Sequence, residues 1–135
     1  MRVVLDTNVI VSALLVQGSV PDRVVELAIA GRCTLMVDSR IVAEYHDVLR
    51  RPEFRFDPAL IAHIVAVLER AEWIVADPLR LTLPDASDRP FIEVAVTGGA
   101  DAIVTGNLRH FRFPRGRLAI PVLTPRQVLD RLAER

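Results

Sequence analysis

Acidic and amide side chains adjoin the apolar segments of this sequence, and their oxygens could bind a metal ion. Asp6 directly follows the first apolar run, and Glu44 lies in the helix predicted after the second. Asp85 and Asp88 open the helix predicted before the third run, and Asn107 follows that run. Two carboxylates about 4 Å apart repel by about 4 kcal/mol at an effective dielectric constant of roughly 20. Converging acids therefore require protons, arginines or a cation, and hard oxygen ligands suit Mg²⁺ or Mn²⁺.

Each acid also has a purely structural interpretation. Aspartate is favoured at helix N-caps, so Asp6 could simply cap the helix that follows it. Glu44 could pair with Arg40, four residues earlier on a solvated helix, and add a few tenths of a kcal/mol. Asp88 could interact with the dipole of its helix, and Asp85 is a residue type common in turns. Only the joint order and context of these residues favour a metal site.

Strands and helices alternate along the chain in a pattern that would bring these residues together. Apolar runs predict buried strands over residues 2–5, 33–37, 102–104 and 118–123, with a short strand or connector at 73–75. Helices are predicted over residues 9–15, from 21 to the glycine at 31, over 40–50, from 57 to about 72, over 88–96 and after 125. This alternation is typical of a parallel sheet covered on both faces. Open sheets of this kind bind ligands outside the carboxyl ends of their strands.

The composition excludes several classes of protein. The chain has 135 residues, of which 51% are hydrophobic, so we expect a single domain over residues 1–135. Its net charge is zero, which argues against both a disordered chain and a broadly basic nucleic-acid coat. All seventeen basic residues are arginine, so a P-loop or any other mechanism that needs a lysine is excluded.

Neither a membrane span nor a secretion signal is expected. The longest charge-free run, residues 7–21, is interrupted by polar residues and is shorter than the ~20 apolar residues of a span. The single cysteine, Cys33, cannot form an internal disulfide and suits a reducing compartment. The sequence therefore predicts a cytoplasmic protein.

Most of the chain resembles the PIN-domain ribonucleases, in particular the small VapC-like toxins of bacterial toxin–antitoxin modules. The matching segments are VVLDTNVIVSALL, SRIVAEYHDVLRRPEF, DASDRPFIEVAVTGGADAIVTGNLRHF and LAIPVLTPRQVL. The resemblance implies an α/β fold, a three-layer α/β/α sandwich with a central parallel sheet of about four to five strands.

The resemblance also implies roles for individual residues. The metal-binding and catalytic acids of the family fall on Asp6, Glu44 and Asp88. Many relatives carry an aspartate at the position of Asn107, whose carbonyl could still bind the ion or a water held by it but adds no charge. Whether one or two ions bind is therefore left open. The remaining polar positions are expected to support the site, namely Thr7, Asn8, Thr105 and Asp85.

By this resemblance, the chain is expected to be an Mg²⁺- or Mn²⁺-dependent endoribonuclease and the toxin of a type II toxin–antitoxin module. Its products would carry a 5′-phosphate and a 3′-hydroxyl. The expected partners are the RNA substrate, a second copy of the chain and a small antitoxin that masks the crevice.

Phosphate binding would fall to arginine, because its planar fork matches phosphate geometry and the chain has no lysine. The densest basic segment is 109–117, in which Arg109 and Arg112 are the leading candidates for RNA contacts. Phe111 and Phe113 could stack on bases, or could simply anchor this segment to the core.

Other basic side chains give weaker signals. The pair Arg50-Arg51 could also bind phosphate, or could only stabilise a helix C-terminus. The three histidines lie on separate segments without the spacing of a zinc site. Of these, His110 is a candidate to support the site because it is close to Asn107.

Two other functions compete with the nuclease. A phosphotransferase of the haloacid-dehalogenase type also starts with an aspartate after its first strand. Such enzymes carry an Asp-x-Asp motif and a conserved lysine. In this chain Asn8 stands at the second aspartate of that motif, and there is no lysine. The stronger alternative is a catalytically weakened PIN-fold module that binds RNA or protein. Asn107 favours this alternative, and the intact acids Asp6, Glu44 and Asp88 argue against it.

Overall fold

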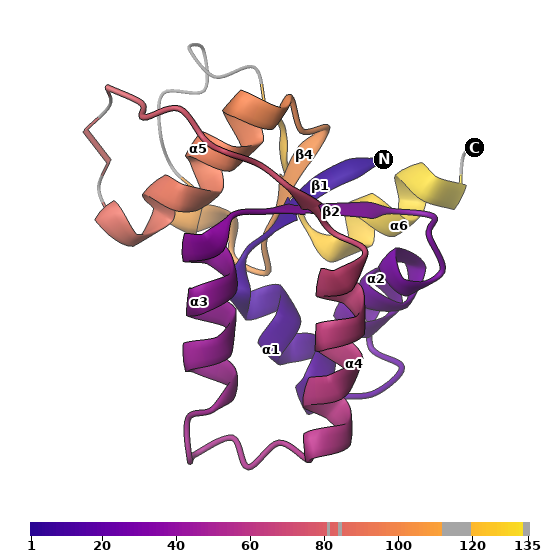
Figure 1. Ribbon diagram of the computed structural model, residues 1–135. Coiled ribbons are helices and arrows are strands. Elements are labelled where there is room, and N and C mark those ends of the chain that lie inside the picture. Colours follow the sequence, from indigo (N-terminus) through magenta and orange to yellow (C-terminus); the bar gives the residue numbers. More distant parts are fainter. Residues whose placement is uncertain (81, 84, 112–119, 134–135) are drawn as a thin grey trace.

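The central element of the fold is a parallel sheet with the strand order β3-β2-β1-β4-β5 (Figure 1). The computed structural model describes residues 1–80, 82–83, 85–111 and 120–133. The strands are β1 (Arg2–Leu5), β2 (Thr34–Val37), β3 (Glu72–Trp73), β4 (Ala102–Val104) and β5 (Val122–Leu123). All neighbouring pairs are parallel, as the uniformly apolar runs predicted.

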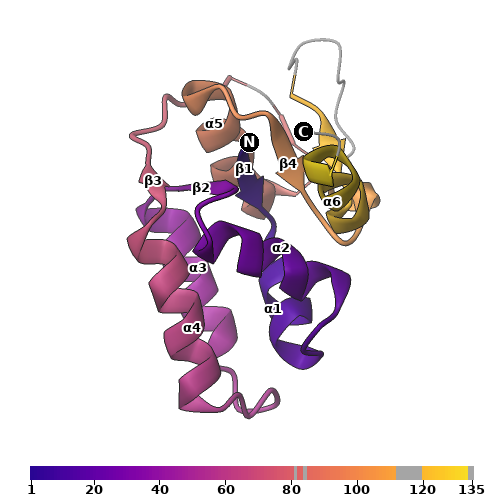
Figure 2. The same cartoon turned by 90° about the vertical axis from the view of Figure 1, so that its right-hand side faces the viewer.

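Helices cover both faces of this sheet. They are α1 (Thr7–Leu15), α2 (Val20–Ile29), α3 (Ser39–Leu49), α4 (Pro58–Glu69), α5 (Arg89–Gly98) and α6 (Pro125–Ala133), with 3₁₀ turns η1 (Ala86–Asp88) and η2 (Leu108–Phe111). Helix α5 packs on β1, β2 and β4, whereas α1 and α2 lie on the opposite side of the sheet and α6 packs on α2 (Figure 2). The predicted three-layer α/β/α sandwich is therefore confirmed. In the described part of the chain, no helix combines the length and apolar character needed to cross a membrane.

Strand β1 lies at the centre of the sheet because it is apolar on both faces. Val3, Val4 and Leu5 are fully buried, as are Ile103 and Val104 in the neighbouring β4. Helices on both sides remove this apolar surface from water, which is the main favourable contribution to folding.

Several element boundaries differ from those predicted. Helix α1 begins at Thr7 rather than two residues later, because the Asp6 carbonyl already accepts a hydrogen bond from the Val9 amide. Helix α4 ends at Glu69 rather than near residue 72, because Glu72 pairs with β2 as part of β3. The last strand is described only over β5, and the predicted residues 118–119 lie outside the described residues. The turn η2 was not predicted.

The order of the strands places a switch point between β1 and β4. From β1 the chain builds outward to β2 and β3, and then returns to add β4 and β5 on the other side. Leu5 and Val104 are register partners, so the residues that follow them lie side by side. Asp6 confirms this proximity, since its amide donates a 2.8 Å hydrogen bond to the Val104 carbonyl. Open α/β sheets bind ligands at this kind of position.

Candidate functional site: an acid-lined pocket at the end of β1

The predicted acids line one pocket at the carboxyl end of β1. Its volume is about 210 Å³. Asp6 follows β1, Glu44 comes from the middle of α3, and Asp85 and Asp88 come from the η1 turn before α5. Acids from three distant stretches of sequence therefore face the same space.

Asp6 does not serve as a capping residue. It occupies the N-cap position of α1, but its side chain accepts no capping hydrogen bond. Its Oδ2 atom instead accepts a 2.7 Å hydrogen bond from the Thr105 hydroxyl and lies 3.2 Å from Nδ1 of His110. The Thr105 hydroxyl is itself oriented, because it accepts a hydrogen bond from the Asn107 amide at 3.1 Å. Asp6 is only 7% exposed, and these contacts hold its carboxylate in a defined position in the lining of the pocket.

Glu44 does not form the predicted pair with Arg40. The Arg40 guanidinium bonds instead to Asp38 and to the buried Glu93, at 2.8 and 2.7 Å respectively. Glu44 accepts a hydrogen bond from the Thr7 hydroxyl, which joins α3 to the first residue of α1. The solvated-pair interpretation of Glu44 is therefore not realised.

The buried Tyr45 sets the rotation of α3. Its hydroxyl donates a 2.5 Å hydrogen bond to the carbonyl of Leu5, the last residue of β1. Because Glu44 precedes Tyr45 in the helix, this contact helps to turn the Glu44 side chain toward the pocket. Desolvation raises the pKa of the Tyr45 phenol well above its usual value, with smaller contributions from Asp6 and Glu44, so the hydroxyl stays protonated as a donor.

The surroundings of Asp88 disfavour the charged form of its carboxyl group. It occupies the N-cap position of α5, yet it accepts no capping hydrogen bond. The pKa of Asp88 is raised to about 6, mainly by burial and in addition by the neighbouring Asp85, Asp6 and Glu44 carboxylates, against an opposing effect of His110. A carboxyl in this state is stabilised by a proton or by an added cation.

Asp85 lines the pocket and also forms a turn. Its Oδ1 atom accepts hydrogen bonds from the Ser87 amide and hydroxyl, at 2.9 and 2.7 Å. These hydrogen bonds lower the pKa of Asp85. Asp85 therefore stays ionised at the exposed edge of the pocket and raises the pKa of Asp88.

The two asparagines have different positions. Asn8 lines the pocket, and its Oδ1 atom accepts a 3.0 Å hydrogen bond from the Gly106 amide, which ties α1 to the segment after β4. Asn107 is not among the lining residues, and its Oδ1 atom accepts a hydrogen bond from the Arg109 amide at 3.1 Å. The side-chain carbonyl of Asn107 therefore caps the start of η2 and does not line the pocket.

The sequence indicates only weakly that His110 belongs to the site. It lines the pocket beside Asp6, in the region where the resemblance had suggested Asn107. The available signal was its distance of three residues from Asn107, whose side chain accepts a hydrogen bond from the first turn of η2. Without knowledge of η2, this spacing had no structural meaning.

The basic segment after β4 is described only in part. Arg109 is exposed on η2 and does not line the pocket. Arg112 and Phe113 lie outside the described residues, so their predicted contacts remain predictions. Phe111 is almost completely buried, which supports its interpretation as a core anchor.

The chemistry of the pocket suits a hydrated divalent ion. In the described part of the chain, no group of three histidine, cysteine, aspartate or glutamate side chains has the geometry to hold a metal ion. Mg²⁺, however, keeps several waters and commonly takes only one or two protein carboxylates. Asp6, Glu44 and Asp88 therefore form no closed protein cage, and an ion bound by them would be held partly through water.

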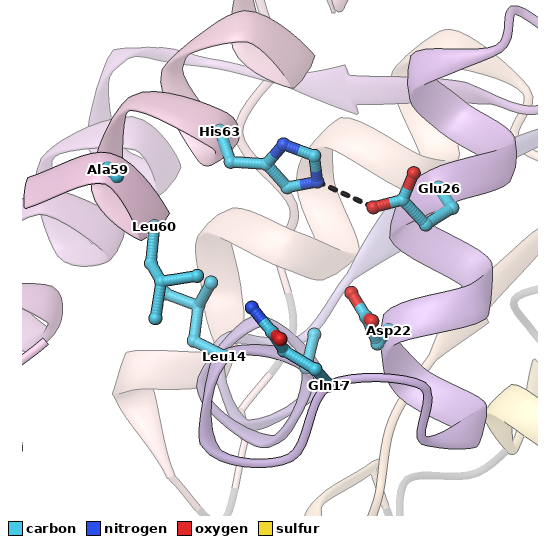
Figure 3. A pocket seen from close by; sticks show the side chains of 8 residues that line it. Leu14, Gln17, Asp22, Glu26, Ala59, Leu60 and His63 are labelled. Carbon is cyan, nitrogen blue, oxygen red and sulfur yellow. Dashed lines mark hydrogen bonds and ion pairs between the residues drawn. The ribbon is translucent and has the colours of Figure 1, made fainter. Parts of the chain in front are cut away.

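The three histidines line three different pockets, as their spacing suggested. His63 lies in a pocket of about 280 Å³ between α1, α2 and α4, where its Nε2 atom is 2.6 Å from Oε1 of Glu26 (Figure 3). His46 lines a hollow near the end of α3, and His110 lines the acid pocket. None of the predicted site residues lines the pocket of His63.

Comparisons with known proteins identify the family and the fold of the chain. The family model described as PIN domain matches residues 2–109 of the chain. Among solved structures, the chain is similar to one described as VapBC2 from Rickettsia felis bound to a DNA fragment from its promoter. The TM-score is 0.59 at 20% sequence identity, and the match covers 92% of this chain and 98% of the other. A search of curated proteins finds no match.

Proposed function

We propose that this chain, which belongs to the PIN domain family, is a metal-dependent ribonuclease and the toxin of a type II toxin–antitoxin module. PIN domains are generally nucleases, which supports hydrolase activity at the level of the family. The family model confirms the PIN-domain resemblance, and the similarity of fold to the VapBC2 structure supports the VapC-like part of the proposal. The dependence on a divalent ion and the choice of RNA are our proposals.

One observation carries this proposal. Asp6, Glu44 and Asp88 line one pocket at the switch point of the sheet. Neither aspartate accepts a side-chain capping bond, and Glu44 does not pair with Arg40. Among the described lining residues, only His110, beside Asp6, can carry a positive charge. Bringing several carboxylates together with so little positive charge costs free energy unless the site compensates for it. Binding of a cation would provide that compensation.

The described side chains would prepare the site for phosphodiester hydrolysis. Asp6, Glu44 and Asp88 would hold Mg²⁺ or Mn²⁺, directly or through water. Once bound, such an ion activates water and neutralises charge on the phosphate and the leaving oxygen. Thr105 holds one oxygen of Asp6, and within the described residues no group donates to the other. That second oxygen is available as a ligand.

The remaining lining residues orient and compensate these acids. Thr7 fixes Glu44 by a hydrogen bond, and His110 lies where its Nδ1 proton, in the tautomer that has one, is donated to Asp6. Asp88 must lose its proton before it can act as a ligand. A bound cation favours that loss because it stabilises the charged form.

A cleavage assay with matched variants tests the proposal. Wild-type protein and Asp6→Asn are incubated with defined tRNA and rRNA in Mg²⁺, in Mn²⁺ and in EDTA, with Asp130→Asn on the exposed face of α6 as the control. We expect cleavage by the wild type and the control only with a divalent ion, and products that carry a 5′-phosphate. Cleavage that persists in EDTA, or in Asp6→Asn at the wild-type rate, would refute the mechanism.

A second candidate function is binding of RNA or protein without cleavage. The capping role of Asn107 favours it, because the pocket then lacks the fourth polar ligand predicted from the sequence. This candidate predicts no preference for divalent cations in a binding titration, whereas the nuclease requires one.

We also propose an antitoxin and a second copy of the chain as partners. The similar structure is described as a VapBC2 assembly on promoter DNA, and this similarity supports a VapB-type partner here. Coexpression with a short open reading frame adjoining the gene, followed by light scattering of the purified material, tests both partners. Recovery of the chain alone, as a monomer, would contradict them.

A further inference from the structure

The acid pocket alone would repel RNA. Four carboxylates face it, and among the described lining residues only His110 can carry a positive charge. Each phosphate of an RNA strand is negatively charged, and proteins hold such strands with basic side chains. A strand that enters this pocket therefore needs cationic groups close by.

Helix α3 leads from the acid pocket to a basic connection. Glu44 and Val48 line the pocket, and the helix continues to its C-cap at Arg50. At a rise of 1.5 Å per residue, Arg50 lies about 9 Å along the helix from Glu44. The chain then turns back through residues 50–57 to start α4, at the end of the α3–α4 pair farthest from the sheet (Figure 1). We call residues 50–57 the hairpin tip.

The hairpin tip carries unpaired arginines. Arg50, Arg51 and Arg55 are exposed, and within the described residues the guanidinium groups of Arg50 and Arg55 form no hydrogen bond or ion pair. Arg51 has a single contact, 3.7 Å from the largely exposed Asp47. Such an exposed pair contributes little to stability, so these charges are available to a ligand.

Two aromatic rings lie among these charges. The rings of Phe54 and Phe56 stack with a centroid distance of 5.2 Å and an interplanar angle of 11°, and both side chains are partly exposed. Arg55 between them has a positive φ of 48°, which costs free energy for a residue with a Cβ atom. Arginines interleaved with aromatic rings are the chemistry with which proteins bind single-stranded nucleic acid.

A hollow adjoins the hairpin tip on the side of α3. Its volume is about 520 Å³, and it is lined by His46, Asp47, Arg50 and Arg51 together with Ala43 and Pro52. Three of the lining side chains carry a positive charge or can acquire one, and only one lining side chain is a carboxylate. Of the two acids within the tip itself, Asp57 is engaged in capping α4 and Glu53 is exposed.

We propose that the hairpin tip is a second RNA-binding surface, whose arginines contact backbone phosphates and whose phenylalanine pair receives a base. This inference rests on the proposed function, because RNA is the substrate it assumes. The surface holds the strand at one end of α3 while the acid pocket acts on the strand beside Glu44. It therefore contributes to the affinity for long RNA and leaves the hydrolytic step unchanged.

Binding without catalysis tests this surface directly. The variant R50Q/R51Q/R55Q removes three charges from the hairpin tip, and R23Q/R126Q/R131Q removes three exposed arginines from α2 and α6 as the matched control. Fluorescence anisotropy with a labelled single-stranded RNA in EDTA measures affinity over a series of salt concentrations. We expect about tenfold weaker binding for the tip variant, with a salt slope reduced by about 2, and nearly unchanged binding for the control.

The phenylalanine pair is tested by Phe54→Leu, which keeps the bulk but removes the aromatic face. We expect about tenfold weaker binding with the same salt slope as the wild type, because the substitution removes base stacking but no charge. Thermal unfolding of each variant establishes that the fold is intact. Wild-type affinity in both the tip variant and Phe54→Leu would overturn the inference.

Kinetics separate failure of this inference from failure of the nuclease proposal. With long RNA, the tip variant should show a KM about tenfold higher at unchanged kcat, whereas a substrate of only a few nucleotides should be cut equally by both proteins. An unchanged KM for long RNA in an active enzyme would refute the surface alone. Absence of cleavage by the wild type, together with weaker binding by the tip variant, would refute the nuclease and retain the surface.

Discussion

Thr105 and Asp6, which are 99 residues apart in sequence, are joined by a 2.7 Å hydrogen bond at the switch point of the sheet. The Thr105 side chain is completely buried, and its hydroxyl also accepts the Asn107 amide. With its proton donated to Asp6, the hydroxyl fixes one carboxylate oxygen, and within the described residues no hydrogen bond engages the other. The proposed chemistry depends on this orientation.

Removal of that hydroxyl should therefore disorient Asp6. We expect Thr105→Val to reduce divalent-ion affinity and RNA cleavage by about 10- to 100-fold, as is usual when a group that orients a metal ligand is lost. Titration with Mn²⁺ and initial cleavage rates measure the two effects. Thr105→Ser, which keeps the hydroxyl, should retain most of both. Equal loss in the serine and valine variants would show that shape rather than the hydrogen bond matters.

The ionisation of Asp88 should make the stability of the metal-free protein depend on pH. Because its pKa in the folded protein is raised from 3.8 to about 6, the folded state binds more protons than the unfolded state between these values. The contribution of Asp88 to the stability of the folded protein is thus most favourable below pH 4 and is lost as the pH rises through about 6.

The substitution Asp88→Asn should remove this loss of stability at high pH. In EDTA, we expect the variant to unfold at a higher temperature than the wild type at pH 8, and the difference to shrink toward pH 4. Asp130→Asn serves as the control for removal of an exposed carboxylate. A variant less stable than the wild type at pH 8 would show that Asp88 is not electrostatically unfavourable in the folded protein.

The contact between Tyr45 and Leu5 should link stability to activity. Tyr45→Phe removes a 2.5 Å hydrogen bond and leaves a buried carbonyl with one donor fewer. We expect a loss of about 1–3 kcal/mol in the free energy of unfolding, measured by urea denaturation. Cleavage should also fall at a temperature where the variant is still folded, because α3 positions Glu44. A fully stable variant would refute the role of this contact.

The general architecture was predictable because this sheet is buried on both faces. Apolar runs such as Arg2–Leu5 and Ala102–Val104 have few alternatives to buried parallel strands, and both appear with the predicted bounds. The helix predicted over residues 88–96 is α5, and Gly99 ends it in the left-handed conformation with a φ of 64°. Local residue preferences and tertiary packing agree at these positions.

The details of the site were harder to predict, because they depend on the direction of single side chains. The position of Asn107 outside the pocket and of His110 within it depends on the η2 turn, which hydrophobic periodicity does not reveal. Likewise, Arg40 was an equally plausible partner for Glu44 until the structure placed Asp38 and Glu93 around it. Sequence alone specified which acids to consider, but the folded chain decided which of them share the pocket.

The central claim is that Asp6, Glu44 and Asp88 together create a site for a divalent ion. Calorimetric titration of the metal-free protein with Mn²⁺ near pH 7.5 tests it directly, using Asp6→Asn, Glu44→Gln and Asp88→Asn beside the control Asp130→Asn. We predict saturable binding by the wild type and the control, and at least about tenfold weaker binding in each of the other three variants. Equal Mn²⁺ affinity in all five proteins, or no saturable binding by the wild type, would contradict the account.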